Sequence, residues 1–337
     1  MAKVSVIGAG SWGTALAMLL AGNGHDTTLW SHREEQAAEL SKTREHKAKL
    51  PGVILPKELK ITSNLEQAAK ERDVLVLAVP SVAVRETSKK LKACALPGQL
   101  IVNVAKGIEA HTLTTLTDMI EEELPGVHAC VLSGPSHAEE VSRGLPTTCV
   151  VGARDKKTAE YLQNIFMSPV FRVYISPDIL GIELGGALKN VIALAAGIAD
   201  GLGYGDNTKA ALITRGIAEI ARLGVKMGGK IETFTGLTGI GDLIVTCASV
   251  HSRNRKAGYL IGQGRSMQEA MDEVQMVVEG VYSAKAAAKL AKKYDVPMPI
   301  VEEVNKVLFE GKSPAEAVDD LMLRESRSEH RALQWEK

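Results

Sequence analysis

Aromatic residues make up only 4% of the 337-residue sequence, whereas glycine occurs 31 times. This composition argues against an aromatic-cored β-sandwich and favours close backbone contacts between alanine-rich helices. The four cysteines, Cys94, Cys130, Cys149 and Cys247, lie far apart in the chain with no C-x-x-C pair. This spacing indicates neither a zinc framework nor a dithiol redox motif, so we expect free thiols in a reducing cytoplasm and no bound metal.

The sequence also lacks an excess of either charge and a long apolar run. Forty Lys and Arg residues balance forty Asp and Glu residues, so no overall basic field attracts nucleic acid. The longest apolar run, 191–199, falls well short of the roughly 20 residues that span a bilayer. We therefore expect a cytoplasmic protein with no nucleic-acid partner and no membrane span.

The two halves of the chain carry different secondary-structure patterns. The first half alternates short β-branched runs with amphipathic segments, which is typical of parallel strands joined by crossover helices. From about Asp178 the strand pattern stops, and long helical periodicity broken by glycine clusters follows. We expect an α/β doubly wound sheet domain over residues 1–177, followed by an all-α C-terminal domain over residues 178–337.

The expected elements can be placed to within a few residues. Three S-x-x-E sequences predict helix starts capped by Ser63, Ser266 and Ser313. Further helices are expected to begin near Thr14, Val82, Leu113 and Thr158. The expected strands are Val4–Ile7, Thr27–Trp30, Val74–Val79, Leu100–Val104, Ala129–Leu132, Thr147–Val151 and Val170–Ile175.

Residues 8–13 read GAGSWG and connect the first expected strand to a helix. In this context a G-x-G-x-x-G pattern predicts a dinucleotide site and a Rossmann-like sheet domain, and a glycine-rich turn without a ligand is the alternative. Gly8 allows the tight turn, and Gly10 lets the backbone approach the pyrophosphate. Gly13 lets the helix pack closely on the strand, with the helix N-terminus facing the negative charge.

The end of the second expected strand indicates the type of dinucleotide. An NAD-specific site would place Asp or Glu there, but this chain continues with Ser31, His32 and Arg33. A guanidinium can chelate phosphate oxygens, so NADP(H) is favoured while NAD(H) remains open. The alternative is that Arg33 is a solvated charge at the start of a helix.

Ligands of open α/β sheets bind at the carboxyl ends of the strands. Lys106 follows one expected strand, where its ammonium can polarise a carbonyl or hold an anion. Ser136 follows another strand, and we expect it to cap the helix that begins near Ala138 while its backbone N–H meets a phosphate. His137 is a candidate base, but a polar residue in the first turn of a helix is the better interpretation because no carboxylate partner is identifiable.

Lys189 lies in a helix that is apolar on nearly all faces. Its ammonium must therefore be paired, solvated by substrate or deprotonated. Desolvation lowers the pKa of a lysine toward neutrality, as a general base requires. The alternative is that the side chain reaches water beside Gly185 and Gly186, and the neighbouring Asn190 adds an amide that can hold a hydroxyl.

A second group of polar residues follows in the helical half. Asp242 places a carboxylate on a glycine-rich segment, and Ser252, Arg253 and Asn254 combine an expected N-cap with a cationic helix start. Together these groups predict an anion site for a substrate phosphate or for the cofactor. A solvated basic patch is the alternative.

Five blocks of sequence resemble the bacterial NAD(P)-dependent glycerol-3-phosphate dehydrogenases: residues 8–15, 105–109, 133–140 and 186–190, and residues 238–243 together with 252–254. The resemblance covers essentially the whole chain in the same order. It implies the reversible reduction of dihydroxyacetone phosphate to sn-glycerol 3-phosphate with NAD(P)H, which feeds glycerophospholipid synthesis. The partner is then a small phosphorylated substrate, and the apolar helices of the second half can build the face of a homodimer.

The resemblance also assigns roles to residues and makes Lys189 the proton acceptor. Ala138, Val277 and Glu279 rest on it alone. It implies substrate contacts for Lys106, Gly134, Ser136, Lys189, Asp242, Ser252, Arg253 and Asn254. The implied cofactor contacts, which include the glycines of the loop, are Gly8, Gly10, Ser11, Trp12, Gly13, His32, Arg33, Lys106, Ala138, Arg253, Val277 and Glu279.

Two other functions remain open. A related hydroxyacid or sugar-acid dehydrogenase would have asparagine four residues after its lysine, whereas here Asn190 follows Lys189 directly and Ala193 occupies the later position. A non-catalytic dinucleotide sensor would not need Lys106, Lys189 and Asp242 together.

Overall fold

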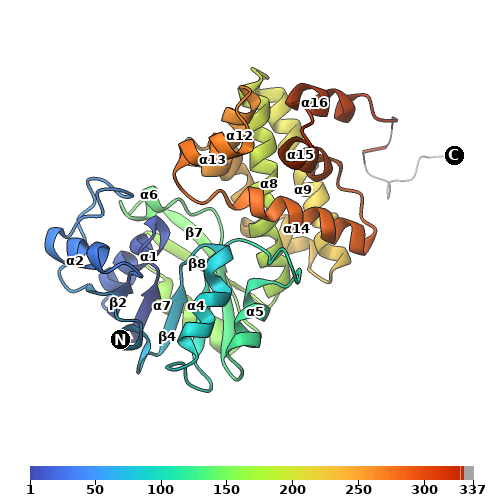
Figure 1. The fold of residues 1–337 in the computed structure, drawn as a ribbon. Coiled ribbons are helices and arrows are strands. Elements are labelled where there is room, and N and C mark those ends of the chain that lie inside the picture. The colour runs from blue at the N-terminus through green and yellow to red at the C-terminus, as the bar shows by residue number, and fades with distance from the viewer. Residues whose placement is uncertain (327, 330–337) are drawn as a thin grey trace.

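The structure is a computed structural model that describes residues 1–326 and 328–329, so the last residues of the expected helical domain lie outside it. Figure 1 shows two parts side by side. The first part is a sheet flanked by helices, and the second consists of helices around a long central one. The chain passes from one to the other between Ser176 and Ile179.

The sheet contains eight strands in the order β3-β2-β1-β4-β5-β6-β7-β8. The strands from β3 to β6 are parallel, β7 is antiparallel to β6, and β8 is parallel to β7. The order reverses between β1 and β4, and this switch point is where doubly wound sheets bind nucleotides. The strands are β1 (Lys3–Ile7), β2 (Asp26–Trp30), β3 (Lys60–Thr62), β4 (Val74–Leu77), β5 (Leu100–Asn103), β6 (His128–Ser133), β7 (Thr147–Gly152) and β8 (Phe171–Ser176).

Helices cover both faces of this sheet, so its central strands are apolar without interruption. Val74 and Val76 of β4 belong to the core under α1 and α7, whereas Leu75 and Leu77 belong to the core under α4 and α5. The alternation follows from the two-residue period of a strand. The helices of this part are α1 (Ser11–Gly22), α2 (Glu34–Thr43), α3 (Leu65–Ala69), the short 3₁₀ turn η1 (Ser81–Ala83), α4 (Val84–Leu91), α5 (Leu116–Glu123), α6 (Ala138–Val141) and α7 (Lys156–Phe166).

The second part is built around α8, which is buried along nearly its whole length. Among the described residues α8 is the one single helix long and apolar enough to cross a membrane, and 89% of its most apolar window is buried inside the protein. This burial is that of a core helix. The elements are α8 (Ile179–Gly201), α9 (Asp206–Lys226), α10 (Ile231–Phe234), the π-helical turn η2 (Leu237–Gly241), α11 (Asp242–Ala248), α12 (Arg253–Gly262), α13 (Met267–Val274), α14 (Glu279–Tyr294), α15 (Pro299–Phe309) and α16 (Pro314–Met322).

The expected fold class is confirmed, with local corrections. The seven expected strands are present, but β3 and α2 were not predicted, and the reversal of β7 departs from an all-parallel sheet. Ser266 and Ser313 form complete capping boxes. The prediction for Ser63 is wrong, because the neighbouring Asn64 caps α3 by accepting from the N–H of Gln67.

Candidate active site

Lys189 lies midway along α8 and is only 5% exposed. Its ammonium donates to Oδ1 of Asp242 at 2.7 Å and to Oγ1 of Thr246 at 2.5 Å. The side chain is therefore paired inside the protein, which excludes the alternative that it reaches open water.

Asp242 is the first residue of α11 and is almost completely buried. The glycine-rich turn η2 brings it close to α8, because a Cβ on Gly185 would lie only 2.6 Å from the carbonyl oxygen of Thr238. The second carboxylate oxygen, Oδ2, accepts from Lys106 at 2.6 Å. One buried carboxylate thus bridges two ammonium groups.

This arrangement sets the charge state of Lys189. Burial, which is the largest effect, and the charge of Lys106 lower the pKa of the lysine to about 8, although the charge of Asp242 opposes them. Burial alone would raise the pKa of Asp242, but Lys106 and Lys189 together bring it below its ordinary value. The carboxylate therefore stays ionised at neutral pH, and Lys189 can release or accept a proton near neutral pH.

Lys106 lies in the loop after β5, at the carboxyl end of the sheet. Its ammonium also donates to the carbonyl oxygen of Gly134 at 3.0 Å, which joins this loop to the one after β6. Ser136 donates to the same carbonyl at 2.9 Å. The prediction that Ser136 caps α6 is wrong, since the N-cap position belongs to His137 and carries no side-chain hydrogen bond.

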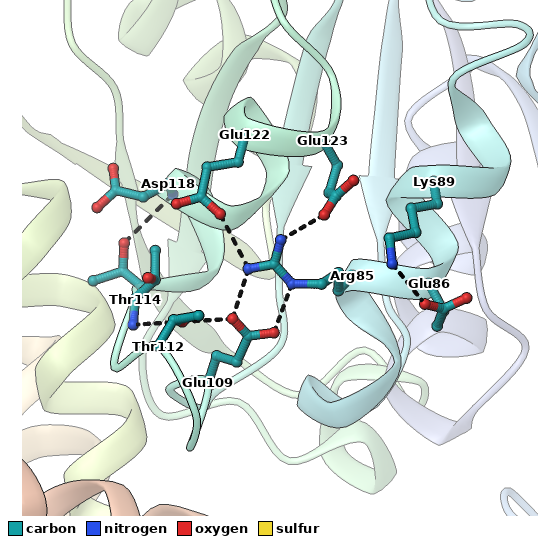
Figure 2. A network of polar contacts seen from close by, with 10 residues as sticks. Arg85, Glu86, Lys89, Glu109, Thr112, Thr114, Asp118, Glu122 and Glu123 are labelled. Atoms are coloured by element: carbon teal, nitrogen blue, oxygen red, sulfur yellow. Dashed lines mark hydrogen bonds and ion pairs between the residues drawn. The ribbon is translucent and has the colours of Figure 1, made fainter.

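A network of charges holds the loop that carries Lys106. Figure 2 shows Arg85 of α4 surrounded by carboxylates from this loop and from α5. Its guanidinium donates to both oxygens of Glu109 at 2.6 Å, and also to Glu122 and Glu123. Because Glu109 is three residues beyond Lys106, this pairing fixes the far end of the loop.

The start of α12 lies beside the same site. Glycines on both helices allow close packing, since a Cβ on Gly258 would lie 2.2 Å from the carbonyl oxygen of Leu194 in α8. Ser252 caps α12 as expected, by accepting from the N–H of Arg255. Asn254 is buried and donates to Oδ1 of Asn190, while the first turn of α12 contains no acidic residue.

The glycine loop after β1 has the geometry that a dinucleotide requires. Gly8 has a φ of +126°, and a Cβ there would lie 2.5 Å from the carbonyl oxygen of Ala78. A Cβ on Gly13 would lie 2.0 Å from the carbonyl oxygen of Gly8, whereas one on Gly10 would meet nothing within 4 Å. The start of α1 has no side-chain cap and no acidic residue, so its N–H groups are available to a pyrophosphate.

Comparison with known proteins agrees with this geometry. Residues 3–159 match the family described as NAD-dependent glycerol-3-phosphate dehydrogenase N-terminus, and residues 178–319 match the corresponding C-terminus. The chain belongs to the NAD-dependent glycerol-3-phosphate dehydrogenase family. As a member of this family it is an oxidoreductase, and a nicotinamide dinucleotide is its cofactor.

Curated relatives and solved structures extend over the full chain. Glycerol-3-phosphate dehydrogenase [NAD(P)+] of Fusobacterium nucleatum is 63% identical over 98% of this chain and 99% of its own length. The enzyme of the same name from Agathobacter rectalis is also 63% identical, over 99% of this chain and all of its own. The crystal structure of glycerol-3-phosphate dehydrogenase from Coxiella burnetii superposes with a TM-score of 0.92 at 36% identity, covering 96% of this chain and 99% of that one.

The structure of this dehydrogenase places the remaining predicted cofactor residues in two groups. Ser11 and Trp12 lie half-buried at the start of α1, and His32 and Arg33 are exposed directly after β2. Ala138 is buried at the start of α6 and belongs to the core of the sheet part.

Val277 and Glu279 lie in the helical part, where α14 begins. Glu279 accepts from the backbone N–H of Ser81 at 3.0 Å and also from the hydroxyl of Ser81, in the 3₁₀ turn after β4. This carboxylate therefore joins the helical part to the sheet part. Burial raises its pKa, although the bonds from Ser81 and the charge of Arg253 oppose that effect.

Two partners of the predicted residues were missed by sequence reasoning. Thr246 donates its hydroxyl to the backbone carbonyl of Asp242 at 2.6 Å and accepts from Lys189. Its position four residues after Asp242 on a helix is the signal that identifies it. Ser81 follows β4, and nothing in the sequence pairs it with Glu279.

Proposed function

We propose that this enzyme interconverts dihydroxyacetone phosphate and sn-glycerol 3-phosphate in glycerophospholipid synthesis, with Lys189 as general acid and base. The observation that supports this role best is the buried Lys189 ammonium paired with Asp242 and Thr246. The nicotinamide ring, when bound, accepts or supplies the hydride at C2 of the substrate.

Lys189 handles the proton that accompanies this hydride. In the oxidative direction its neutral amine takes the proton of the C2 hydroxyl. In the reductive direction its ammonium returns a proton to the C2 oxygen. A pKa of about 8 suits both directions, because each form of the lysine is accessible near neutral pH.

Lys106 and Asp242 prepare Lys189 for this task. The carboxylate orients both ammonium groups, since each of its oxygens accepts from a different lysine. Lys106 places a second positive charge near the C2 oxygen, where it stabilises the negative charge that develops during proton transfer. Exclusion of water from this buried pair strengthens both effects.

The substrate phosphate is held at the start of α12 in this proposal. Ser252 caps the helix, Arg253 is exposed beside it, and Asn254 is fixed by Asn190. Free N–H groups, the helix dipole and a guanidinium all favour a dianion. The other substrate contacts we propose are Gly134 and Ser136 in the loop after β6.

We propose NADP(H) as the preferred cofactor. Lys49 has a lowered pKa because of burial and because the charges of Arg33 and Arg253 lie near it. Among the described residues none of these three cations forms an ion pair with a carboxylate, although the charge of Arg253 acts on Glu279. Such a gathering of positive charge favours a phosphate-rich ligand, and in this proposal Arg33, with His32 beside it, binds the 2′-phosphate.

The remaining cofactor contacts in this proposal are those implied by the resemblance. They combine the glycine loop with residues from the sheet part and from the helical part. The proposal includes no metal. The proposed contacts are Gly8, Gly10, Ser11, Trp12, Gly13, His32, Arg33, Lys106, Ala138, Arg253, Val277 and Glu279.

The deciding experiment follows cofactor absorbance in purified protein mixed with dihydroxyacetone phosphate, with NADPH and NADH in parallel. Lys189→Met should abolish oxidation of either cofactor, whereas Lys312→Met, which removes a lysine paired with Glu303 at the far end of the helical part, should not. Turnover that survives Lys189→Met would refute the proposed base. Binding of NADPH without turnover would favour the sensor or another hydroxyacid substrate.

The same assay tests the cofactor preference. Arg33→Gln should raise the KM for NADPH about tenfold or more, because a charge-assisted bond to the 2′-phosphate is lost. The KM for NADH should change little. An equal effect on both cofactors would mean that Arg33 does not distinguish them.

We also propose how the chain is organised in the cell. Residues 1–177 and 178–337 act as two domains, which is supported by the change of element type at Ile179. The enzyme works in the cytoplasm as a homodimer, for which exposed apolar side chains such as Val225, Ile231 and Tyr282 offer contact area. Sedimentation at micromolar concentration measures this directly, and a monomer would refute the dimer.

A further inference from the structure

One ring nitrogen of His137 is buried inside the protein. Its Nε2 atom has no hydrogen-bond partner among the described residues. Buried ring nitrogens are normally paired, because leaving one unpaired costs its full desolvation. The residue follows Ser136, one of the proposed substrate contacts, directly in the loop after β6.

Two further contacts locate the ring. Its centroid lies 5.9 Å from that of His251, the residue just before the cap of α12. The ring also lies within hydrogen-bonding reach of the backbone carbonyl of Val245 in α11, and the charges of Lys189 and Lys106 act on it. The imidazole therefore lies close to the lysine pair and to the residue that precedes α12, near the proposed positions of the reacting carbon and the phosphate.

The ring is neutral in this position. Burial lowers the pKa of His137, and the positive charges of Lys189 and Lys106 lower it further, against weaker opposing effects from Glu139 and the Val245 carbonyl. A neutral imidazole has one N–H donor and one acceptor nitrogen. It is a poor partner for a phosphate dianion, which Arg253 and the helix N-terminus suit better.

We propose that Nε2 of His137 hydrogen-bonds the C1 hydroxyl of the substrate and thereby selects for it. This inference rests on the proposed function, in which Lys189 meets the C2 oxygen and α12 holds the phosphate. The C1 hydroxyl is then the polar substrate group without a partner. A hydroxyl both donates and accepts, so it satisfies Nε2 in either tautomer of the ring.

The test compares dihydroxyacetone phosphate with acetol phosphate, which lacks the C1 hydroxyl and is otherwise the same ketone. The unchanged enzyme should use acetol phosphate with a kcat/KM lower by about tenfold or more, since a buried partner is left unpaired. His137→Phe keeps a ring against His251 but has no ring nitrogen. The kcat/KM values of this variant for the two ketones should lie within about twofold of each other, because only the value for dihydroxyacetone phosphate should fall.

Two further variants separate this role from a structural one. His137→Gln offers an amide that donates and accepts, so it should recover part of the discrimination even if the phenylalanine variant folds poorly. His251→Phe changes the neighbouring ring and should leave the discrimination as it is in the unchanged enzyme. If His137→Phe discriminates between the two ketones as strongly as the unchanged enzyme does, the role of His137 is overturned and the proposed function still stands. Failure of the unchanged enzyme to reduce either ketone would overturn the proposed function and this inference with it.

Discussion

Lys189 donates a hydrogen bond of 2.7 Å to Asp242, which lies 53 positions further along the chain on a different helix. The same carboxylate also accepts from Lys106, so it is shared between two cations. Its negative charge is what keeps the pKa of the buried Lys189 as high as about 8. The pH dependence of catalysis should therefore depend on this one pair.

Oxidation of sn-glycerol 3-phosphate requires neutral Lys189, so its rate should rise with pH around a midpoint near 8. Reduction requires the ammonium and should decline over the same range. Asp242→Asn removes the negative charge that raises the pKa of Lys189, so the midpoint should move to lower pH and kcat should fall. Initial rates between about pH 6 and about pH 10 measure both effects. Asp26→Asn, which removes an aspartate paired with Lys60 on the sheet, is the control, and an unmoved midpoint in Asp242→Asn would contradict the assignment.

Gly10 and Gly13 make a matched pair for testing the glycine loop. Gly13→Ala would press a methyl group against the carbonyl oxygen of Gly8, so the free protein should lose several kcal/mol of unfolding free energy, on the order of an overpacked core. Gly10→Ala meets no atom within 4 Å and should leave stability unchanged. Its affinity for cofactor should nevertheless fall at least about tenfold, because the methyl group occupies the space where the pyrophosphate approaches.

Urea unfolding and fluorescence titration with NADPH distinguish the two effects. Normal cofactor affinity in Gly10→Ala would show that the dinucleotide does not approach this backbone.

Local sequence rules predicted the parts of the site that depend on local chemistry. Lys189 was identified because an ammonium in a helix that is apolar on nearly all faces must be paired, solvated by substrate or deprotonated. Asp242 was identified because it places a carboxylate on a glycine-rich segment. What the rules did not supply is which residue pairs with which. Both lysines on one carboxylate, and Ser81 on Glu279, are products of tertiary packing between segments that are remote in sequence.

The same limit explains the errors in the fold. The strand Lys60–Thr62 has only three residues and is not fully buried, so its pairing with β2 rather than its own pattern defines it. The two-residue period of β7 likewise does not indicate whether this strand runs parallel or antiparallel to β6. At α3 the S-x-x-E pattern suggested Ser63, but Asn64 is as good a cap and lies one residue closer to the helix.

Arg85 should matter for catalysis although it touches no substrate. Arg85→Gln leaves Glu109, Glu122 and Glu123 without their shared counter-charge, as Figure 2 makes clear. The side chain is 23% exposed, so we expect a loss of roughly 1–3 kcal/mol in unfolding free energy. The freed loop should also raise the KM for dihydroxyacetone phosphate several-fold through misplacement of Lys106.

Arg154→Gln is the control for this prediction. It removes an arginine paired with Glu121, but one that is 63% exposed, so the expected loss is below about 1 kcal/mol with unchanged KM. Equal behaviour of the two variants would mean that the Arg85 network does not position the loop.

Glu183 connects the two parts of the enzyme and should make its stability fall as pH rises. The carboxylate lies on α8 and accepts from the N–H of Thr117 at 3.0 Å and from its hydroxyl, at the start of α5. Burial raises its pKa to about 7, although the bonds from Thr117 oppose this effect. The folded chain therefore keeps a proton that the unfolded chain releases above its ordinary pKa of 4.5. The unfolding free energy should therefore fall between about pH 4.5 and about pH 7, and Glu183 should account for up to about 3 kcal/mol of this loss.

Glu183→Gln mimics the protonated acid and cannot ionise, so this share of the pH dependence should disappear. In urea unfolding the variant should match the unchanged enzyme near pH 5 and exceed its stability near pH 8. Glu269→Gln provides the opposite sign, because its bonds from Ser266 lower the pKa of Glu269 and stabilise the ionised form. A Glu183→Gln variant that is destabilised equally at both pH values would mean that Glu183 is ionised in the folded enzyme. The junction between α8 and α5 would then depend on a buried charge rather than on a buried acid.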